Sequence, residues 1–130
     1  MTRAPRFVLA MALACLAAFP ALAQQDDAAV ATATAVLDRL DAGQFDAATA
    51  DFNPQMKAAL GADKLAAAQQ QLDAAGAMQS RGEARVSQRD GLTLVVVRIQ
   101  RALAAIDATV AIDGAGKVAG LHFAPAANAQ

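Results

Sequence analysis

The side chains that could carry chemistry are few and far apart along the chain. His122 is the single histidine and Cys15 the single cysteine, Ser80 and Ser87 are the two serines, and tryptophan and tyrosine are absent. A serine or cysteine nucleophile needs a base within hydrogen-bond reach, and neither serine lies in a G-x-S-x-G turn. A zinc site needs several histidine or cysteine ligands. We therefore predict no catalytic residue, no cofactor-binding residue, no metal ligand and no cofactor.

The acidic residues of the C-terminal half do not form a calcium loop. Asp107 and Asp113 lie on one face of a predicted strand, without the ligand spacing that calcium needs, and a solvated sheet face is expected. Gly114-Ala115-Gly116 has no helix after it, which excludes a phosphate-binding loop. Acid–base catalysis in a pocket needs a carboxylate and a hydroxyl donor, and the lack of tyrosine weakens that alternative.

Positive charge gathers in the same half of the chain. Five arginines lie there: Arg81, Arg85, Arg89, Arg98 and Arg101. A solvated face is the main interpretation. Because Arg85 and Arg89 share a strand face, a strip facing an anion or a partner is the alternative. The strand pattern directs His122 outward or towards a partner. The net charge of −1 excludes a nucleic-acid surface.

The N-terminal segment has the pattern of a secretory signal peptide. Arg3 and Arg6 precede an uncharged apolar run over residues 7–19, and Ala21-Leu22-Ala23 forms an A-x-A cleavage site. The run is shorter than the ~20 residues of a membrane span. We expect cleavage after Ala23, a periplasmic or secreted protein, and no span in the mature chain. Lipid attachment at Cys15 is the rival interpretation.

The next part of the chain has helical spacing. Residues 26–41, 44–51, 54–60 and 62–75 are predicted helices, separated by Gly43, Asn53-Pro54, Gly61 and Gly76. Asn53 is a favoured N-cap and Pro54 suits a first turn.

After Gly76 the spacing changes to a period of two. Residues 77–81, 83–89, 92–99, 106–113 and 117–124 read as strands, and Asp90-Gly91 predicts a tight hairpin. We expect both faces of 92–99 to be largely covered.

Helices followed by antiparallel strands define an α+β fold. We expect three to four N-terminal helices packed on a curved antiparallel sheet of about four strands, forming a cone with a pocket between the layers. The predicted organisation is a signal peptide over 1–23, a flexible N-terminal segment over 24–29, a single domain over 30–125 and a disordered tail over 126–130. Many of the 38 alanines lie in the helices, so the core should be thin.

Three segments resemble a known family. Residues 37–48, 53–60 and 103–123 are similar in hydrophobic order and glycine turns to domain-of-unknown-function family 3887. The resemblance covers roughly residues 30–125. It implies a cone of the NTF2-like or cystatin-like kind, often found outside the cytoplasm and sometimes ahead of a serine hydrolase. It carries over no catalytic residues.

The chain departs from that family in its packing residues. Gln69 stands where the family usually has tryptophan, Met78 where it has an aromatic residue, and Arg101-Ala102-Leu103 where aromatic and acidic residues are expected. We therefore expect the helices to pack on the sheet more loosely than is usual in that family.

Function is predicted by elimination. The leading hypothesis is a non-enzymatic exported module that binds a protein partner or a small apolar ligand. An accessory domain acting with a separate serine hydrolase, and an isomerase or hydrolase using the cone pocket, stay open as alternatives. A homodimer formed through the sheet is a further interaction left open.

Overall fold

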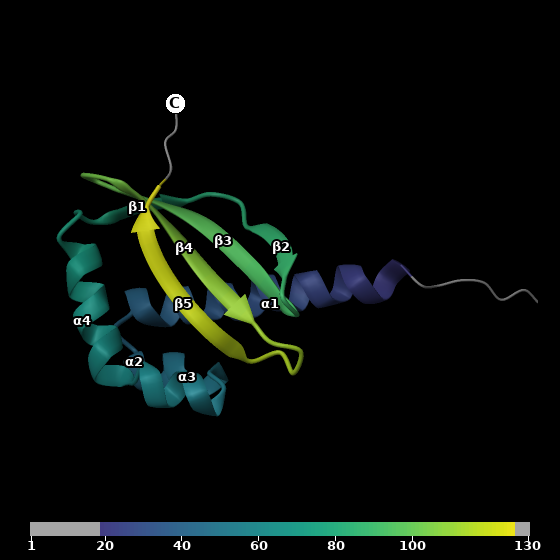
Figure 1. Cartoon of the computed structure of the whole chain (residues 1–130). Coiled ribbons are helices and arrows are strands. Elements are labelled where there is room, and N and C mark those ends of the chain that lie inside the picture. Colours follow the sequence, from purple (N-terminus) through teal and green to yellow (C-terminus); the bar gives the residue numbers. More distant parts are fainter. Residues whose placement is uncertain (1–18, 127–130) are drawn as a thin grey trace, which may run out of the picture.

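The computed structural model describes the backbone of residues 19–126 and the side chains of 24–126. Within these residues, helices come first and strands follow, as the α+β prediction requires. The elements are α1 Phe19–Asp41, α2 Phe45–Ala48, the 3-10 helix η1 Thr49–Asp51, α3 Pro54–Ala59, α4 Ala62–Asp73, β1 Met78–Arg81, β2 Arg85–Arg89, β3 Leu92–Arg101, β4 Ala105–Ile112 and β5 Val118–Pro125. The helices gather on one side of a curved sheet (Figure 1).

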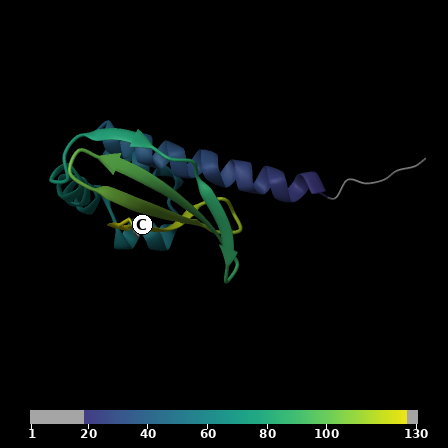
Figure 2. The same cartoon turned by 90° about the horizontal axis from the view of Figure 1, so that it is seen from above.

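The breaks between helices lie where the punctuating residues predicted them. The Asn53 side chain accepts a hydrogen bond from the Met56 N–H at 2.8 Å, and Pro54 occupies the first turn of α3. The expected helix over 44–51 is divided into α2 and η1. Helix α1 runs along the sheet and continues past it (Figure 2). The segment 24–29, predicted to be flexible, lies within α1.

The five strands form one antiparallel sheet in the order β1-β3-β4-β5, with β2 also paired to β3. Strand β1 pairs with the Ile99–Arg101 end of β3, and β2 pairs with its Leu92–Val96 end. The sheet is therefore at most four strands wide, and it contains five strands where about four were expected. Asp90 and Gly91 both have positive φ, at 52° and 81°, as a tight hairpin between β2 and β3 requires.

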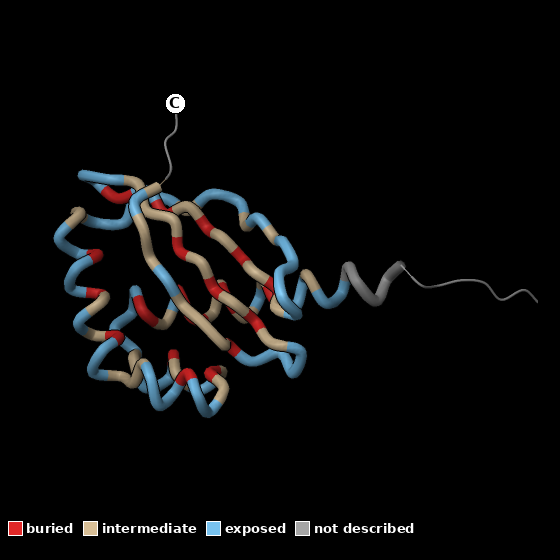
Figure 3. The backbone as a smooth tube through the Cα atoms, in the orientation of Figure 1, coloured by how far each residue is buried: buried red, intermediate tan, exposed pale blue. Residues whose placement is uncertain are grey.

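The core lies between the helices and one face of the sheet. Alternate residues of β3 and β4 are buried, as the two-residue period requires, and the buried positions recur along both strands in Figure 3. The helical side of the core is built from Ala33, Val36, Leu37, Leu40, Phe52 and Leu65. Leu94 and Val96 point to the other face and are only half-buried. The helix-facing side of this strand is thus buried and its outer side is covered in part.

Neither terminus of the chain is fully described. The predicted signal peptide over 1–23 and the predicted tail over 126–130 lie almost wholly outside the described residues. Of the helices that the structure describes, none is long and apolar enough to cross a membrane.

Gly76 gives the first testable prediction. Its φ is +95°, and a Cβ at this position would lie 2.7 Å from the Ala102 Cβ. Gly76→Ala should lower the free energy of unfolding by about 2 kcal/mol or more, since it combines a strained φ with a steric clash. Denaturant unfolding measures this change.

Two further variants control this experiment. Gly114 lacks a positive φ, and a Cβ at this position would have no atom within 4 Å, so Gly114→Ala should leave stability nearly unchanged. Adding Ala102→Gly to Gly76→Ala should recover part of the loss because it removes the closest contact. Equal effects of Gly76→Ala and Gly114→Ala would contradict the steric argument.

Candidate binding site

A cavity of about 420 Å³ lies between α4 and the last strand, β5. Helix α4 contributes Ala68, Gln71 and Leu72. The start of β4 and the turn before it contribute Ala104, Ala105 and Ile106, and β5 contributes Leu121, His122, Phe123, Ala124 and Pro125. We call this cavity the α4–β5 pocket.

The sequence explains why this pocket is apolar. Leu121 lies opposite Val110 and Phe123 opposite Ala108, so both side chains share the helix-facing side of the sheet. Ala68 and Leu72 are four residues apart and therefore lie on the same face of α4. Alanine at position 68, in place of a larger apolar residue, leaves the space open.

Among the described residues, His122 is the one ionisable residue that lines the α4–β5 pocket. It lies opposite Thr109, on the outer side of β5, and its side chain is exposed, which agrees with the outward direction predicted for it. No carboxylate or hydroxyl side chain from residues 24–126 lines the pocket beside it. The pocket therefore offers shape and apolar surface, without a paired acid and base.

A second cavity of about 320 Å³ lies between α1 and the turn that joins β4 to β5. Its one ionisable residue is Asp113, whose carboxylate accepts hydrogen bonds from the Ala115 N–H and the Lys117 N–H, each at 2.9 Å, and from the Asn53 side chain at 3.2 Å. The bond from the Lys117 N–H, then that from Asn53, lowers the pKa of Asp113. This carboxylate holds the turn and has little bonding capacity left for a ligand.

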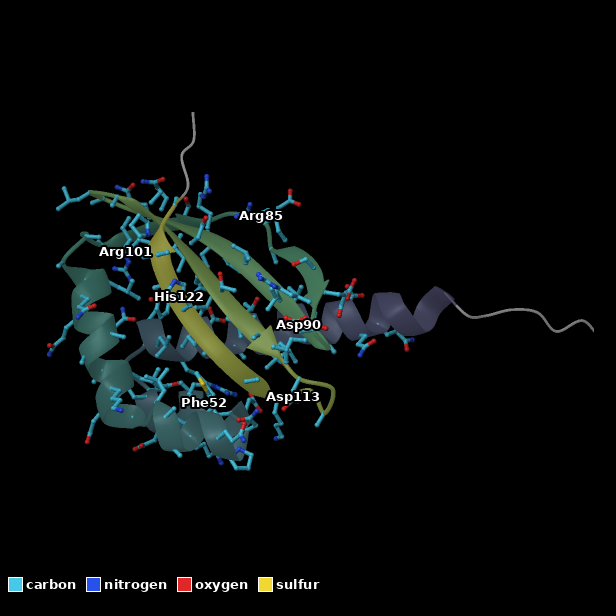
Figure 4. The ribbon with its side chains drawn as sticks, viewed as in Figure 1. Phe52, Arg85, Asp90, Arg101, Asp113 and His122 are labelled. Carbon is cyan, nitrogen blue, oxygen red and sulfur yellow. The ribbon has the colours of Figure 1, made fainter. Side chains whose placement is uncertain are left out.

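The two aspartates that the sequence placed on one strand face have separate roles. Asp107 lies on β4 and binds the Arg98 guanidinium at 2.9 Å, with Arg85 at 3.6 Å. The hydrogen bond from Arg98 to Asp107 raises the pKa of Arg98. Asp113 lies in the next turn, at the opposite end of the sheet from Arg101 (Figure 4). The sheet face that was expected to be solvated therefore carries ion pairs at Asp107.

The predicted arginine cluster divides between the two faces of the sheet. Arg85, Arg89 and Arg98 lie on the outer face, whereas Arg81 and Arg101 turn towards the helices. The Arg101 side chain is 3% exposed, and it donates to the Gly76 carbonyl at 2.8 Å. Arg85 and Arg89 thus share one strand face, as the sequence predicted, and Arg81 and Arg101 do not extend that face.

Arg101 and Arg81 form the centre of an ionic cluster with three aspartates. Arg101 lies 3.5 Å from Asp41 and 3.4 Å from Asp73. Arg81 lies 2.6 Å from Asp41 and from Asp38. The cluster joins the C-terminal ends of α1 and α4 to β1 and β3. Sequence reasoning missed it, although Arg101 has the same two-residue phase as the buried Val97 and Ile99.

The remaining candidate residues do not add to a reactive site. Gln69 is buried beside this ionic cluster, where its side-chain N–H donates to Asp73 at 3.1 Å, and its Oε1 has no partner. Ser80 lies on β1 and Ser87 on β2, away from both cavities. Over the described part of the chain, no group of three or more potential ligands could hold a metal ion. Cys15 lies outside the described residues.

The fold and the pocket together define a small α+β domain with an apolar cavity at one edge of its sheet. The family model described as "Protein of unknown function (DUF3887)" matches residues 33–121. The chain therefore belongs to this family, as the resemblance predicted. No curated protein and no solved structure matches the chain.

Asp41 gives a prediction about the ionic cluster. Its carboxylate contacts both arginines of the cluster and is 26% exposed, whereas Asp73 is 63% exposed. Asp41→Asn should lower the free energy of unfolding by about 2–3 kcal/mol, because it removes the negative charge that pairs with two guanidinium groups. Asp73→Asn, the matched control, should cost less than about 1 kcal/mol. Urea unfolding of both variants is the measurement, and equal losses would contradict the assigned roles.

Asp113 gives a pH-dependent prediction. Since its pKa is lowered in the folded state, its contribution to stability is complete above the ordinary carboxyl pKa of about 3.9 and is lost as the pH falls through the folded value. Asp113→Asn should cost about 1 kcal/mol at neutral pH, and this difference should vanish on acidification. Asp27→Asn, at an exposed position of α1, is the control and should show no such pH dependence. Thermal melts from pH 7 to pH 2 test it.

Proposed function

We propose that this chain is an exported, non-enzymatic binding module that holds an apolar ligand group in the α4–β5 pocket. The observation that carries the proposal is the composition of the pocket. Its inward side chains, Leu72, Ile106, Leu121 and Phe123, are apolar, and its volume of about 420 Å³ is within the range of small-molecule sites. Burial of apolar surface supplies the affinity, and the few polar groups at the rim supply orientation.

The arrangement of the pocket favours binding over catalysis. General acid–base work needs two groups of matched pKa near one reacting atom, and His122 has no titratable partner among the residues that line the pocket. The histidine also lies on the outer side of β5, directed away from Leu121 and Phe123. These positions favour the binding hypothesis over the isomerase or hydrolase alternative.

Export and the fold type complete the proposal. The basic start, apolar run and A-x-A site support a signal peptide that ends at Ala23, and thus a periplasmic or secreted location. Helices on one face of a curved sheet, with a cavity between the layers, support an NTF2-like cone. The mature chain after Ala23 contains no cysteine, so ligand binding would not depend on thiol chemistry.

A large side chain placed inside the α4–β5 pocket should prevent a ligand from binding there. Ala68 lines the pocket, and the neighbouring Ala67 is exposed. We expect the neutral dye N-phenyl-1-naphthylamine to fluoresce on binding the wild-type protein. Ala68→Phe should weaken this binding by at least about tenfold, a loss of about 1.4 kcal/mol, because the ring occupies the cavity.

Ala67→Phe is the matched control, since it places the same ring on the same helix away from the cavity. It should bind the dye as the wild type does. Circular dichroism and thermal melts check that both variants are folded. Equal dye binding by the two variants, or no dye binding by the wild type, would contradict the proposed function.

A further inference from the structure

The outer edge of β5 is a free sheet edge beside the α4–β5 pocket. Strand β5 is the last strand of the sheet, and no strand within residues 19–126 pairs with it on its far side along Leu121–Pro125. Successive residues of an antiparallel edge strand direct their backbone groups alternately towards the neighbouring strand and away from it. The register with β4 is unbroken along Leu121–Pro125, so the direction of each backbone group in this stretch can be assigned.

One hydrogen bond fixes this alternation. The Ala126 N–H donates to the Ala105 carbonyl on β4 at 2.9 Å. By the two-residue period, Ala124 and His122 also direct their N–H and C=O groups towards β4. Leu121 and Phe123 direct theirs away from it, to the free edge, and Pro125 offers a carbonyl alone.

The start of the same edge already accepts a backbone from elsewhere in the chain. Phe52 forms a parallel bridge with Val118, and the Asn53 N–H donates to the Val118 carbonyl at 2.9 Å. This contact covers the first residue of β5 and leaves the edge free from Leu121 onward. It shows that this end of the edge accepts a backbone hydrogen bond from another part of the chain.

The free backbone groups and the pocket belong to the same residues. Leu121 and Phe123 line the α4–β5 pocket with their side chains and present N–H and C=O dipoles at its border. A ligand complementary to both features has alternating backbone donors and acceptors together with an apolar side chain. A small apolar molecule would fill the pocket and leave the four edge groups to water.

We propose that the natural ligand is an extended peptide segment that adds as a strand to β5 and places one uncharged apolar side chain in the α4–β5 pocket. This inference rests on the proposed function and names its ligand class. Strand addition of this kind draws affinity from main-chain hydrogen bonds and specificity from the pocket. Because Pro125 lacks an N–H, the ladder is short and is centred on Leu121 and Phe123.

A second copy of the chain fits this edge less well than a peptide does. Its own β5 would bring Leu121 and Phe123, whose side chains already line that copy's pocket. Two cavities would then meet, and neither would receive a side chain. A peptide has a free apolar side chain to offer, and it requires no second set of helices beside the edge.

The experiment uses a panel of acetylated and amidated hexapeptides on the intact protein. In each hexapeptide the third residue is leucine, methionine, phenylalanine or aspartate, and the other five residues are threonine. Amide chemical shifts follow the titration, and hydrogen exchange is measured with and without peptide. We expect the best apolar peptide to bind at least about tenfold more tightly than the aspartate peptide and to displace N-phenyl-1-naphthylamine.

The backbone contact has its own readout. Peptide should slow exchange of the Leu121 and Phe123 amide protons by at least about tenfold, whereas the His122 and Ala124 amide protons, bonded to β4, should change little. Two N-methylated versions of the best peptide, blocked at alternate residues, form a matched pair. One should lose binding about tenfold and the other retain it, since only one set of N–H groups faces β5.

The outcomes separate this inference from the proposed function. Dye binding without peptide binding, or peptide binding without protection of Leu121 and Phe123, would overturn the proposal of a peptide ligand. The proposed function of the apolar pocket would still stand. Equal effects of the two N-methylated peptides, or peptide binding unaffected by Ala68→Phe, would also overturn it. A concentration-dependent dimer that protects the same amides without peptide would replace the peptide by a second copy. Failure of dye binding in the wild type would remove the proposed function itself.

Discussion

The buried guanidinium of Arg101 is the constraint on which the arrangement of helices and sheet depends. A buried cation is costly unless its charge is paired, and the terminal nitrogens of Arg101 contact Asp41, Asp73 and the Gly76 carbonyl, which come from separate parts of the chain. Helix α1 ends at Asp41 and helix α4 ends at Asp73, so each places an acidic side chain near its own negative pole. The positive charge of Arg101 offsets the repulsion between each carboxylate and the negative end of its helix. The Gly76 turn lies against the β3–β4 turn through bonds from Ala102 to Ala77 and from Leu103 to Ala75.

The same anchor accounts for the position of the pocket. Helix α4 is held to the sheet at its C-terminal end, where Asp73 and Gly76 contact Arg101. Along its length the helix faces β5 with Ala68 and Leu72, and the small alanine side chain leaves the cavity open. Because α4 is rich in alanine and is bonded to the sheet at its C-terminal end, a space remains between the helix and the edge of the sheet. The composition of the chain and the location of the site have a common physical cause.

Much of the fold could be predicted because its determinants are local. Asn53-Pro54, Gly76 and Asp90-Gly91 fix where helices and turns begin and end, and the two-residue period after Gly76 predicts the strands. The roles of the arginines could not be read from composition because they depend on which elements meet. The strand phase alone would have placed Arg101 inward, but its aspartate partners are 60 and 28 residues away. The pocket depends on the angle between α4 and β5, which no local pattern encodes.

The free edge of β5 also bears on how the protein behaves in concentrated solution. Exposed edges invite pairing between molecules and growth of extended aggregates. Here the Phe52–Asn53 segment covers one end of the edge, and Pro125 interrupts donors at the other. The exposed ladder is therefore too short to propagate from one molecule to the next. An edge of this length can admit a brief strand and still resist open-ended polymerisation, which favours a protein that stays dispersed.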